Sequence, residues 1–520
     1  MLVFHGYLLR GTGSNVYNAS LARTLAALGH EVHLLCQDRE PPELFPEGAS
    51  GSVTVHNPEI GGLLPVYVHD AYEGFEVKTF PELSDAELDA YIERNVAAVR
   101  EVADAVGGFD AALANHLVMA PVILARAGLR FALKIHGSDL SYVVLPHLER
   151  FRPYAEEAVT AASGILVGSG HIAERLRQAV DRPEVNAKVR LGPPGVDTDL
   201  FAPLAPGRRA DRLRDLAREL GRVREDASEG HAPPEGGSGE KPVQEAGNSP
   251  NPTGSAWDRD LAGAAEAVGW FAEATGPRVL FVGKLIVSKG IDLLLAAWPL
   301  VRAKHPEARL LIVGFGALEP VLRDIWAALE RGDLTPLTAL AQRGRGLEGA
   351  EDARLSILTA FLTSPPPDYA EMARAAAAAA AFAGRLEHGE VGELVPACDA
   401  LVFPSTFPEA FGMVAAEAAS AGVLPVSAAH SGAVEVSREL AAGLEGAPRE
   451  LVSFELGPGA VEAIAGRLDE WLALDAAERE RAGSALRSTV ERLWSWEGVA
   501  RGVLAASAGE LDGLAKPSSG

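Results

Sequence analysis

The sequence contains few cysteines, with only Cys36 and Cys398 among its 520 residues. Two cysteines build neither a disulfide framework nor a cysteine-based metal cluster, so disulfide-stapled and zinc-cysteine proteins are excluded. The length is enough for two domains or more. Hydrophobic residues make up 48% of the chain and charged residues 23%, which is ordinary for a globular protein with sizeable cores.

Positive charge is also scarce. Lysine and arginine number 47 against 71 aspartates and glutamates, giving a formal net charge of -24. This balance argues against a general nucleic-acid binder and provides no attraction to anionic membranes. We therefore expect no nucleic-acid partner and at most peripheral membrane contact. A phosphate site in this chain has to be built locally, against the overall field.

Long apolar runs are missing as well. The longest alanine-rich stretch, Ala375 to Ala383, is too short to span a membrane. The first residues, MLVFHGYLLRGTG, lack a basic segment followed by a long apolar core, so they do not form a signal peptide. We expect a soluble, cytoplasmic protein.

The most informative segment runs from Pro404 to Gly422 and reads PSTFPEAFGMVAAEAASAG. It follows a short apolar run, Ala400 to Phe403, that is typical of a buried strand. Prolines then break the strand into a loop, and strong helix formers follow from Phe411 until Gly422 ends the helix. Glu409 is therefore predicted in the loop before the helix, and Glu417 about two turns further on.

This segment has the chemistry of a nucleotide-sugar site. A helix N-terminus offers unpaired N–H groups and a positive dipole end to a phosphate. Gly412 allows the backbone to approach such an anion without a side chain in between. The carboxylates of Glu409 and Glu417 can accept hydrogen bonds from sugar hydroxyls. The alternative is a plain buried helix that carries two incidental acids.

Glu409 and Glu417, with Phe411-Gly412 between them, resemble the Glu-x7-Glu signature of retaining glycosyltransferases of the GT-B fold, family 4 type. The flanking PS, EAFG and SAGVLPV sequences strengthen this resemblance. It implies that Glu409 binds the hydroxyls of the donor sugar and Glu417 the ribose. It also assigns donor binding to the backbone at Phe411, Gly412 and Met413.

The first half alternates strand and helix patterns, which predicts a parallel sheet in an α/β fold. A capping box at Ser84 to Glu87 opens a helix that extends to about Val106, whereas Gly51 to Phe80 looks irregular. Strands are expected at the start of the chain and in four further places: Met1 to His5, Val32 to Leu35, Ala111 to Asn115, Phe131 to Ile135 and Gly164 to Gly168.

A glycine-rich loop, Gly6 to Asn15, follows the first strand. The dinucleotide fingerprint needs a third glycine near Val16, which is absent, so a Rossmann dehydrogenase is disfavoured. In the resembled family this loop faces the cleft between the domains, and we expect Gly13 to contact the donor. The alternative is a tight turn without a ligand.

His136 lies at the end of a predicted strand, within the sequence HGSD. Parallel sheets present ligand-binding residues at the carboxyl ends of their strands. In the resembled family this histidine contacts the donor sugar, and the same role is expected here; a structural hydrogen bond is the alternative. His116 and Asp139 are weaker candidates. Ser169 and the segment 195–197 are expected to form turns.

Residues 203–275 interrupt the pattern. A charged helix is predicted from Arg208 to Glu225, and Ser228 to Ser255 has too few apolar residues to offset the entropy of ordering. We interpret this apolar-poor stretch as a disordered insertion in the hinge, within a disordered or hinge insertion that spans 203–275. The second alternating domain then begins with a strand at Arg278 to Val282.

Lys284 and Lys289 lie in the turn that follows this strand. Two cations there are suited to grip a diphosphate and to stabilise it as it leaves. The family has Gly-Arg followed five residues later by Lys-Gly, so Lys284 replaces an arginine and loses its bidentate fork. Solvated surface lysines are the alternative.

The rest of the second domain contains three further expected features. The strand Arg309 to Val313 ends in a Gly314-Phe315-Gly316 turn that lets the backbone approach the donor, and residues 317–381 form a helical insertion with a helix from Tyr369 to Ala381. The segment Phe382 to His388 resembles the part of the family that packs against the nucleobase, which assigns donor binding to Arg385 and Leu386. Another turn at His430 to Ala433 and three C-terminal helices complete the pattern.

Together these features predict an α/β protein of the GT-B architecture, with two doubly wound Rossmann-like domains facing across a cleft. The expected domains are 1–202, completed by helix 495–510, then the insertion 203–275, and 276–494. We expect a bacterial-type hexosyltransferase that retains anomeric configuration and needs no metal or other cofactor. A same-fold phosphorylase or epimerase, or a non-catalytic sugar-nucleotide sensor, are the alternatives. Donor base, sugar and acceptor are left open.

Overall fold

The computed structural model describes residues 1–9, 13–44, 48–67, 74–229, 259–348 and 354–517, with the backbone alone described in 223–229. The chain forms two compact units. The first comprises Met1–Ala202, Ser405–Leu456 and Asp475–Gly520, and the second comprises Pro203–Pro404 and Gly457–Leu474. The domain bounds expected from the sequence stay a prediction.

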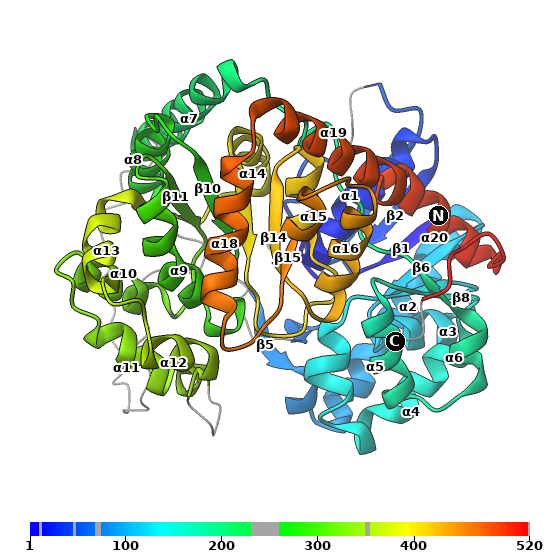
Figure 1. Ribbon diagram of the computed structural model, residues 1–520. Coiled ribbons are helices and arrows are strands. Elements are labelled where there is room, and N and C mark those ends of the chain that lie inside the picture. The colour runs from blue at the N-terminus through cyan, green and yellow to red at the C-terminus, as the bar shows by residue number, and fades with distance from the viewer. Residues whose placement is uncertain (10–12, 45–47, 68–73, 230–258, 349–353, 518–520) are drawn as a thin grey trace. The chain divides into compact units, whose positions relative to one another are not determined.

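A seven-stranded sheet forms the centre of residues 1–202 (Figure 1). Its order is β3-β2-β1-β6-β7-β8-β9, and every pair is parallel. The middle strands are buried on both faces, as parallel sheets covered by helices are. The strands are β1 (Leu2–Phe4), β2 (Glu31–Leu35), β3 (Ser52–His56), β6 (Ala112–Asn115), β7 (Ala132–Ile135), β8 (Gly164–Val167) and β9 (Val189–Leu191).

The capping box predicted at Ser84 is present. The Ser84 hydroxyl accepts from the Glu87 N–H and the Glu87 carboxylate accepts from the Ser84 N–H, which starts α2 (Asp85–Val106). Gly107 in the left-handed conformation ends the helix. The other helices of residues 1–202 are α1 (Gly13–Ala27), α3 (Ala120–Ala127), α4 (Leu148–Ala161), α5 (Gly170–Ala179) and α6 (Pro183–Lys188).

The second sheet has the order β12-β11-β10-β13-β14-β15. β10 pairs in parallel with β11 and β13, β11 with β12, and β14 with β15. The prediction of an α/β fold with two parallel sheets is therefore confirmed. The strands are β10 (Arg278–Val282), β11 (Arg309–Val313), β12 (Ala380–Gly384), β13 (Ala400–Phe403), β14 (Leu424–Ala428) and β15 (Ser453–Phe454).

Helices cover the second unit from several places in the sequence. α9 (Ile291–Lys304) and α18 (Ala460–Ala473) lie side by side although about 160 residues separate them, as the green and orange helices in Figure 1 show. The expected helical insertion is present as α10 (Glu319–Leu329), α11 (Thr335–Arg343), α12 (Ser356–Thr363) and α13 (Tyr369–Ala376), followed by α14 (His388–Leu394).

The remaining helices of the first unit come from its C-terminal segments. They are α15 (Met413–Ser420), α16 (Ser431–Ala442), α17 (Pro448–Leu451), α19 (Ala476–Leu493) and α20 (Trp496–Ala508). α18, α19 and α20 confirm the three predicted C-terminal helices. α20 packs against α1, β7 and β8 of the same unit, and Val196 forms a parallel bridge with Ser495.

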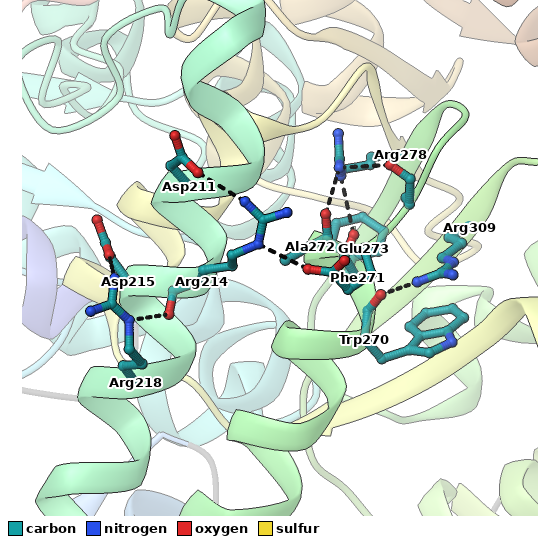
Figure 2. A network of polar contacts seen from close by, with 11 residues as sticks. Asp211, Arg214, Asp215, Arg218, Trp270, Phe271, Ala272, Glu273, Arg278 and Arg309 are labelled. Atoms are coloured by element: carbon teal, nitrogen blue, oxygen red, sulfur yellow. Dashed lines mark hydrogen bonds and ion pairs between the residues drawn. The ribbon is translucent and has the colours of Figure 1, made fainter.

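The described parts of 203–275 form two helices. α7 (Arg209–Glu229) confirms the predicted charged helix, and α8 (Leu261–Ala272) packs against it. Arg278 of β10 donates to the carbonyls of Phe271 and Ala272 at 3.1 and 2.9 Å, which satisfies the C-terminal end of α8 (Figure 2). The segment most depleted in apolar residues lies mainly outside the described residues.

Several strands were missed from the sequence, including β9 and β15. Gly51 to Phe80 contains β3, β4 (Leu63–Val66) and β5 (Glu76–Thr79), where the alternating Val53-Thr54-Val55 was the overlooked signal. The predicted helix to Ala381 ends at Ala376, and Ala380–Gly384 forms β12 beside β11. Pairing with a buried strand outweighs the helix propensity of this alanine run, which is less than 1 kcal/mol per residue.

Candidate active site

Glu409 lies in the loop between β13 and α15, as the sequence predicts, and its position is held on three sides. Its carboxylate accepts a hydrogen bond from the Ser405 hydroxyl at 2.6 Å. Its N–H donates to the Ser431 hydroxyl at 2.8 Å, and its carbonyl accepts from the Gly432 N–H at 2.9 Å. A carboxylate fixed in this way is oriented before any ligand arrives.

The turn after β14 provides this support. His430 Nε2 donates to the Ser405 carbonyl at 2.7 Å, and the Ser431 hydroxyl lies 3.2 Å from His430 Nδ1. A Cβ on Gly432 would lie 2.5 Å from the Ala410 carbonyl oxygen, so only glycine fits there. The turn predicted at His430 to Ala433 is thus present, and its structural function is to clamp the loop of Glu409.

The N-terminus of α15 follows directly. Gly412 precedes it with a φ of 129°, a conformation that favours glycine, and no side chain in the described residues caps the helix. The first N–H groups of a helix have no intrahelical partner, which suits an anion. Glu417 is 6% exposed on the second turn, and Phe411 packs its ring edge-on against Trp494 at 5.3 Å.

The glycine loop and the histidine turn meet this segment within the first unit. A Cβ on Gly13 would lie 3.9 Å from the sulfur of Met413, and one on Gly137 would lie 3.1 Å from the Cβ of Ala410. Gly13 begins α1, and His136 follows β7. The first unit therefore brings together Gly13, His136, Glu409, Phe411, Gly412, Met413 and Glu417.

His136 belongs to a buried chain of side-chain hydrogen bonds. Its Nε2 donates to the side-chain Oδ1 of Asn115 at 2.8 Å. The side-chain Nδ2 of Asn115 donates to Oδ1 of Asn18 at 2.8 Å and to the main-chain carbonyl of Phe4 at 3.0 Å. Asn18 in turn donates to Nδ1 of His5 at 3.0 Å, and His5 Nε2 donates to Asn15 Oδ1 at 2.8 Å.

This chain determines the tautomer of His136. Asn115 uses its amide nitrogen for two acceptors, so it presents its carbonyl oxygen to His136, and only a protonated Nε2 can donate to it. Nδ1 then carries the lone pair and accepts hydrogen bonds. No partner of Nδ1 occurs among the described residues. His136 is half-buried, and its Nδ1 is suited to a hydroxyl donor such as a sugar.

Burial keeps these imidazoles neutral. It lowers the pKa of His5 to about 4. It also holds the pKa values of His116 and His136 well below their ordinary value, with smaller contributions from neighbouring positive charges such as that of Lys134. Lys134 itself is buried, donates to the Gly192 carbonyl at 2.6 Å, and has a pKa lowered to about 7 by burial. Around His5 and His136, this edge of the sheet therefore offers neutral imidazole and amide groups.

The two weaker candidates of the sequence have packing roles. His116 is 1% exposed, its ring lies 4.1 Å from that of Tyr67 and 4.7 Å from that of His136, and neither ring nitrogen has a hydrogen-bond partner among the described residues. The buried Asp139 carboxylate accepts from the N–H groups of Gly137 and Leu117. It therefore ties the turn of His136 to the loop after β6.

Ser169 is the N-cap of α5 and donates its hydroxyl to the Ala410 carbonyl at 2.7 Å. The next two N–H groups, of Gly170 and His171, donate to the carboxylate of Glu435 at 2.7 and 2.9 Å. These contacts all lie within the first unit. The turn expected at Ser169 is thus a second support for the loop of Glu409.

In the second unit, Lys284 and Lys289 lie in the loop after β10. Lys284 is exposed, and the Lys289 ammonium is half-buried, 5.9 Å from the ring centroid of Phe403. Backbone hydrogen bonds join this loop to the loop after β11. The Leu285 N–H donates to the Phe315 carbonyl, and the Leu318 N–H donates to the Leu285 carbonyl. The two cations therefore sit on an anchored backbone.

Gly314 and Gly316 allow the backbones of these two loops to approach so closely. A Cβ would lie 1.8 Å from the Gly283 carbonyl oxygen at Gly314 and 2.5 Å from the Leu285 carbonyl oxygen at Gly316. Close approach of two protein backbones therefore explains these glycines, and contact with the donor stays a prediction.

The Arg385 guanidinium lies over the Phe315 ring at 5.6 Å and donates to Glu387 at 2.9 Å, while the Leu386 side chain is buried. The loops after β10, β11 and β12 thus lie at one edge of the sheet. The second unit brings together Lys284, Lys289, Gly314, Gly316, Arg385 and Leu386.

The sequence reading did not single out His5, Asn15, Asn18 or Asn115 as a network. The available signal was their position, since His5, Asn115 and His136 follow three neighbouring strands of one parallel sheet. Among the residues that the structure describes, no three His, Cys, Asp or Glu side chains are grouped to hold a metal. In the same residues, no helix has the length and apolar character needed to cross a membrane.

Three family models match the chain. The model described as Glycosyltransferase Family 4 matches residues 11–200, and two models described as Glycosyl transferases group 1 match residues 276–339 and 372–488. A curated relative is the glycogen synthase of Mycobacterium tuberculosis, 29% identical over 241 residues. That match covers 45% of this chain and 44% of the relative, so the chain spans less than half the length of that protein.

Solved structures show the same fold at low identity. Sucrose-phosphate synthase from Thermosynechococcus elongatus has a TM-score of 0.51 at 17% identity, with 96% of each chain covered. The HepE protein of Anabaena, in complex with UDP-glucose, has a TM-score of 0.54 at 15% identity, with 98% of this chain and 99% of that chain covered. These likenesses establish the GT-B fold.

Proposed function

Because the chain belongs to the glycosyltransferases of group 1, family 4 type, we propose that it transfers a hexose from a nucleoside-diphosphate sugar to a hydroxyl acceptor, with retention at the anomeric carbon. The observation that carries this proposal is the pairing of the held Glu409 carboxylate with the uncapped N-terminus of α15, three residues apart. One offers an acceptor to sugar hydroxyls and the other offers N–H groups to a phosphate.

The other residues take roles that follow from their charge and burial. His136 accepts a hydroxyl of the donor sugar at Nδ1, because its Nε2 proton is committed to Asn115. Glu417 accepts the ribose hydroxyls. Lys284 and Lys289 stabilise the diphosphate as negative charge develops on it, and the amides of Gly412 and Met413 assist. Gly13 allows close approach, and Arg385 with Leu386 packs along the base.

Retention is proposed to follow a same-face mechanism. No residue of the described site is singled out as a covalent nucleophile for a double displacement. The departing diphosphate instead accepts the proton of the acceptor hydroxyl while the new bond forms on the same face. The lysines replace a metal on the diphosphate, so we expect no requirement for a divalent cation.

Donor binding is the first test. Thermal unfolding is measured with UDP-, GDP- and ADP-glucose for wild type and for Glu417→Gln, which keeps the size of the side chain. A donor that binds the native state raises the melting temperature. The increase is expected for one base, and Glu417→Gln is expected to lose it. The exposed Glu439→Gln on α16 is the matched control and should keep it.

Transfer and its stereochemistry are the second test. Proton NMR of the product reports the anomeric configuration directly, and retention is expected, with the same rate in excess EDTA. An inverted product would overturn the proposed mechanism. Release of a sugar phosphate in the presence of phosphate would favour the phosphorylase, and binding without hydrolysis or transfer would favour the sensor.

A further inference from the structure

A small polar cavity opens at the carboxyl ends of β2 and β3, in the first unit. Its volume is about 250 Å³, and its lining includes Gln37, Arg39, Asn57, Glu59 and Phe75. Gln37 and Arg39 follow β2, while Asn57 and Glu59 follow β3. None of these residues belongs to the site described above, although they lie at the same edge of the same parallel sheet as His5, His116 and His136.

The walls of this cavity are held in place before any ligand binds. The Asn57 amide nitrogen donates to the carbonyls of Cys36 and Asp38 at 3.1 and 2.9 Å, and Gln37 donates to the Pro58 carbonyl at 3.0 Å. Arg94 donates to the Ile60 carbonyl at 2.6 Å. These bonds fix the loop after β3, so binding here orders little backbone.

Several polar groups remain available to a ligand. Asn57 donates both of its side-chain amide hydrogens to backbone carbonyls, so its Oδ1 remains as an acceptor. Gln37 is only 5% exposed, and its Oε1 has no hydrogen-bond partner among the described residues. Arg39 and Glu59 are exposed, and neither has a partner in the described part of the chain.

The composition of this lining selects the ligand class. Planar amides, a guanidinium and a carboxylate match pairs of neighbouring hydroxyls, and the Phe75 ring offers an apolar face. The one positive and one negative side chain cancel, so a strongly anionic ligand gains nothing from the pair. A volume below the roughly 300–1,000 Å³ of drug-sized pockets leaves room for about one sugar ring.

The distance to the reacting centre defines how such a ligand reaches it. The order β2-β1-β6-β7 places three strand intervals between the cavity and His136, which at about 4.8 Å per interval is about 14 Å. A single hexose is much shorter than this, whereas a chain of several linked sugars spans it. Tyr7 lies between the cavity and the histidines in the fold, because its carbonyl accepts from the Gln37 N–H at 2.8 Å and its ring is 5.4 Å from that of His5.

We infer that this cavity is a remote acceptor subsite, which holds the distal unit of a neutral oligosaccharide while its end hydroxyl reaches the donor sugar held by Glu409 and His136. The inference rests on the proposed glycosyl transfer and narrows its acceptor to a chain of about three or more sugars. A monosaccharide acceptor leaves the cavity empty and gains nothing from it.

The test measures binding of fluorescently labelled gluco-, manno- and galacto-oligosaccharides of one to six units to the full chain. In one series the Kd is expected to fall with length and to level off once the cavity is filled. Glu59→Gln and Asn57→Ala are expected to weaken binding of the longer chains by about tenfold each, as loss of one hydrogen bond does. Glu101→Gln, an exposed glutamate of α2, is the matched control and should bind as wild type does.

Three results would overturn the subsite. One is binding that does not depend on length in any series. Another is a length dependence that Glu59→Gln and Asn57→Ala leave unchanged, which would place the distal units elsewhere. The third is competition by inorganic phosphate or a sugar phosphate, which would mean an anion site. The donor-induced increase in melting temperature is measured for the same variants. It reports on donor binding at Glu417 and not on the cavity. A variant that keeps this increase but loses no oligosaccharide affinity therefore contradicts the subsite alone, and not the proposed transfer.

Discussion

The ligand-facing edges of the two parallel sheets use opposite chemistry. In the first unit, His5, Asn18, Asn115 and His136 form a buried chain of neutral hydrogen bonds. In the second unit, Lys284 and Lys289 lie on a loop that backbone hydrogen bonds and close-packed glycines anchor. A hydroxyl needs a directed acceptor, whereas a diphosphate needs charge. The first edge therefore suits hydroxyl groups, and the second edge suits an anion.

The largest effect is expected from Lys289→Ala. Losing a preorganised group that stabilises charge in the transition state costs about 10²–10³ in turnover, whereas folding should hardly change, because the side chain is half-buried and the loop is fixed by its backbone. Transfer kinetics and urea unfolding measure the two effects. Lys304→Ala, an exposed lysine paired with Asp469, is the control. A loss below about threefold would show that the charge of the second edge is dispensable.

Asn115→Leu should, unlike Lys289→Ala, clearly lower the stability of the fold. It removes the partner of His136 and of Asn18 and leaves buried polar atoms unsatisfied, at a cost of about 2–3 kcal/mol in the free energy of unfolding. It also frees the tautomer of His136, so donor affinity should fall as well. Asn186→Leu, at an exposed position, should change stability little. Equal stabilities of the two variants would contradict the network.

Acid should weaken the first edge selectively. His5 and His116 have pKa values below the ordinary 6.5 because of burial. Below that pH the unfolded chain takes up protons that the folded chain does not. The free energy of unfolding should therefore fall as the pH drops from about 6.5 toward 4, by about 1.4 kcal/mol per pH unit for each histidine.

His116→Phe isolates one of these contributions. The phenylalanine ring keeps the aromatic neighbours and loses no hydrogen bond to a described residue. The free energy of unfolding should therefore depend less steeply on pH, by the contribution of one histidine. Urea titrations between pH 4.5 and 6.5 measure it. His30→Gln, on a loop away from this cluster, should leave the slope unchanged. An unchanged slope in His116→Phe would mean that His116 is charged in the folded state.

The smallest effect is expected at Arg214, in the network between α7 and α8. Arg214 pairs with Asp211 at 2.8 Å and Glu273 at 2.9 Å (Figure 2), but these side chains are largely exposed, and exposed ion pairs contribute little. Arg214→Ala should leave the midpoint of urea unfolding unchanged within error. A clear loss would show that charge also stabilises the fold of the second unit.

The sequence predicted most of the fold because its signals were local. The capping box at Ser84 fixes the start of α2, and the apolar runs at Arg278 to Val282 and Ala400 to Phe403 are strands. It failed where pairing decides the element, as at Ala380–Gly384, and where a polar linker packs, as at α8. A strand needs a neighbour, and no neighbour can be read from a stretch of alanines.

The candidate site likewise has parts that the sequence predicted and parts that it did not. The residue types and spacing around Glu409, Glu417, Lys284 and Lys289 were sufficient for the family, because a phosphate and a sugar demand those groups near a helix start. The supports of the site were not visible. Gly432 beneath Glu409 and Gly314 against Gly283 are contacts between separate loops.

The sequence by itself determined the two parallel α/β units and the acidic and basic residues that define the family, since periodicity and short motifs are written along the chain. Only the tertiary structure decided which nitrogen of His136 accepts a hydrogen bond, because Asn115 contacts it from β6 and is itself oriented by Asn18 of α1. It also decided that Gln37 and Asn57 line one cavity, because parallel pairing of β2 with β3 brings their ends together. Contacts between residues far apart in sequence depend on packing, and packing is a property of the whole fold.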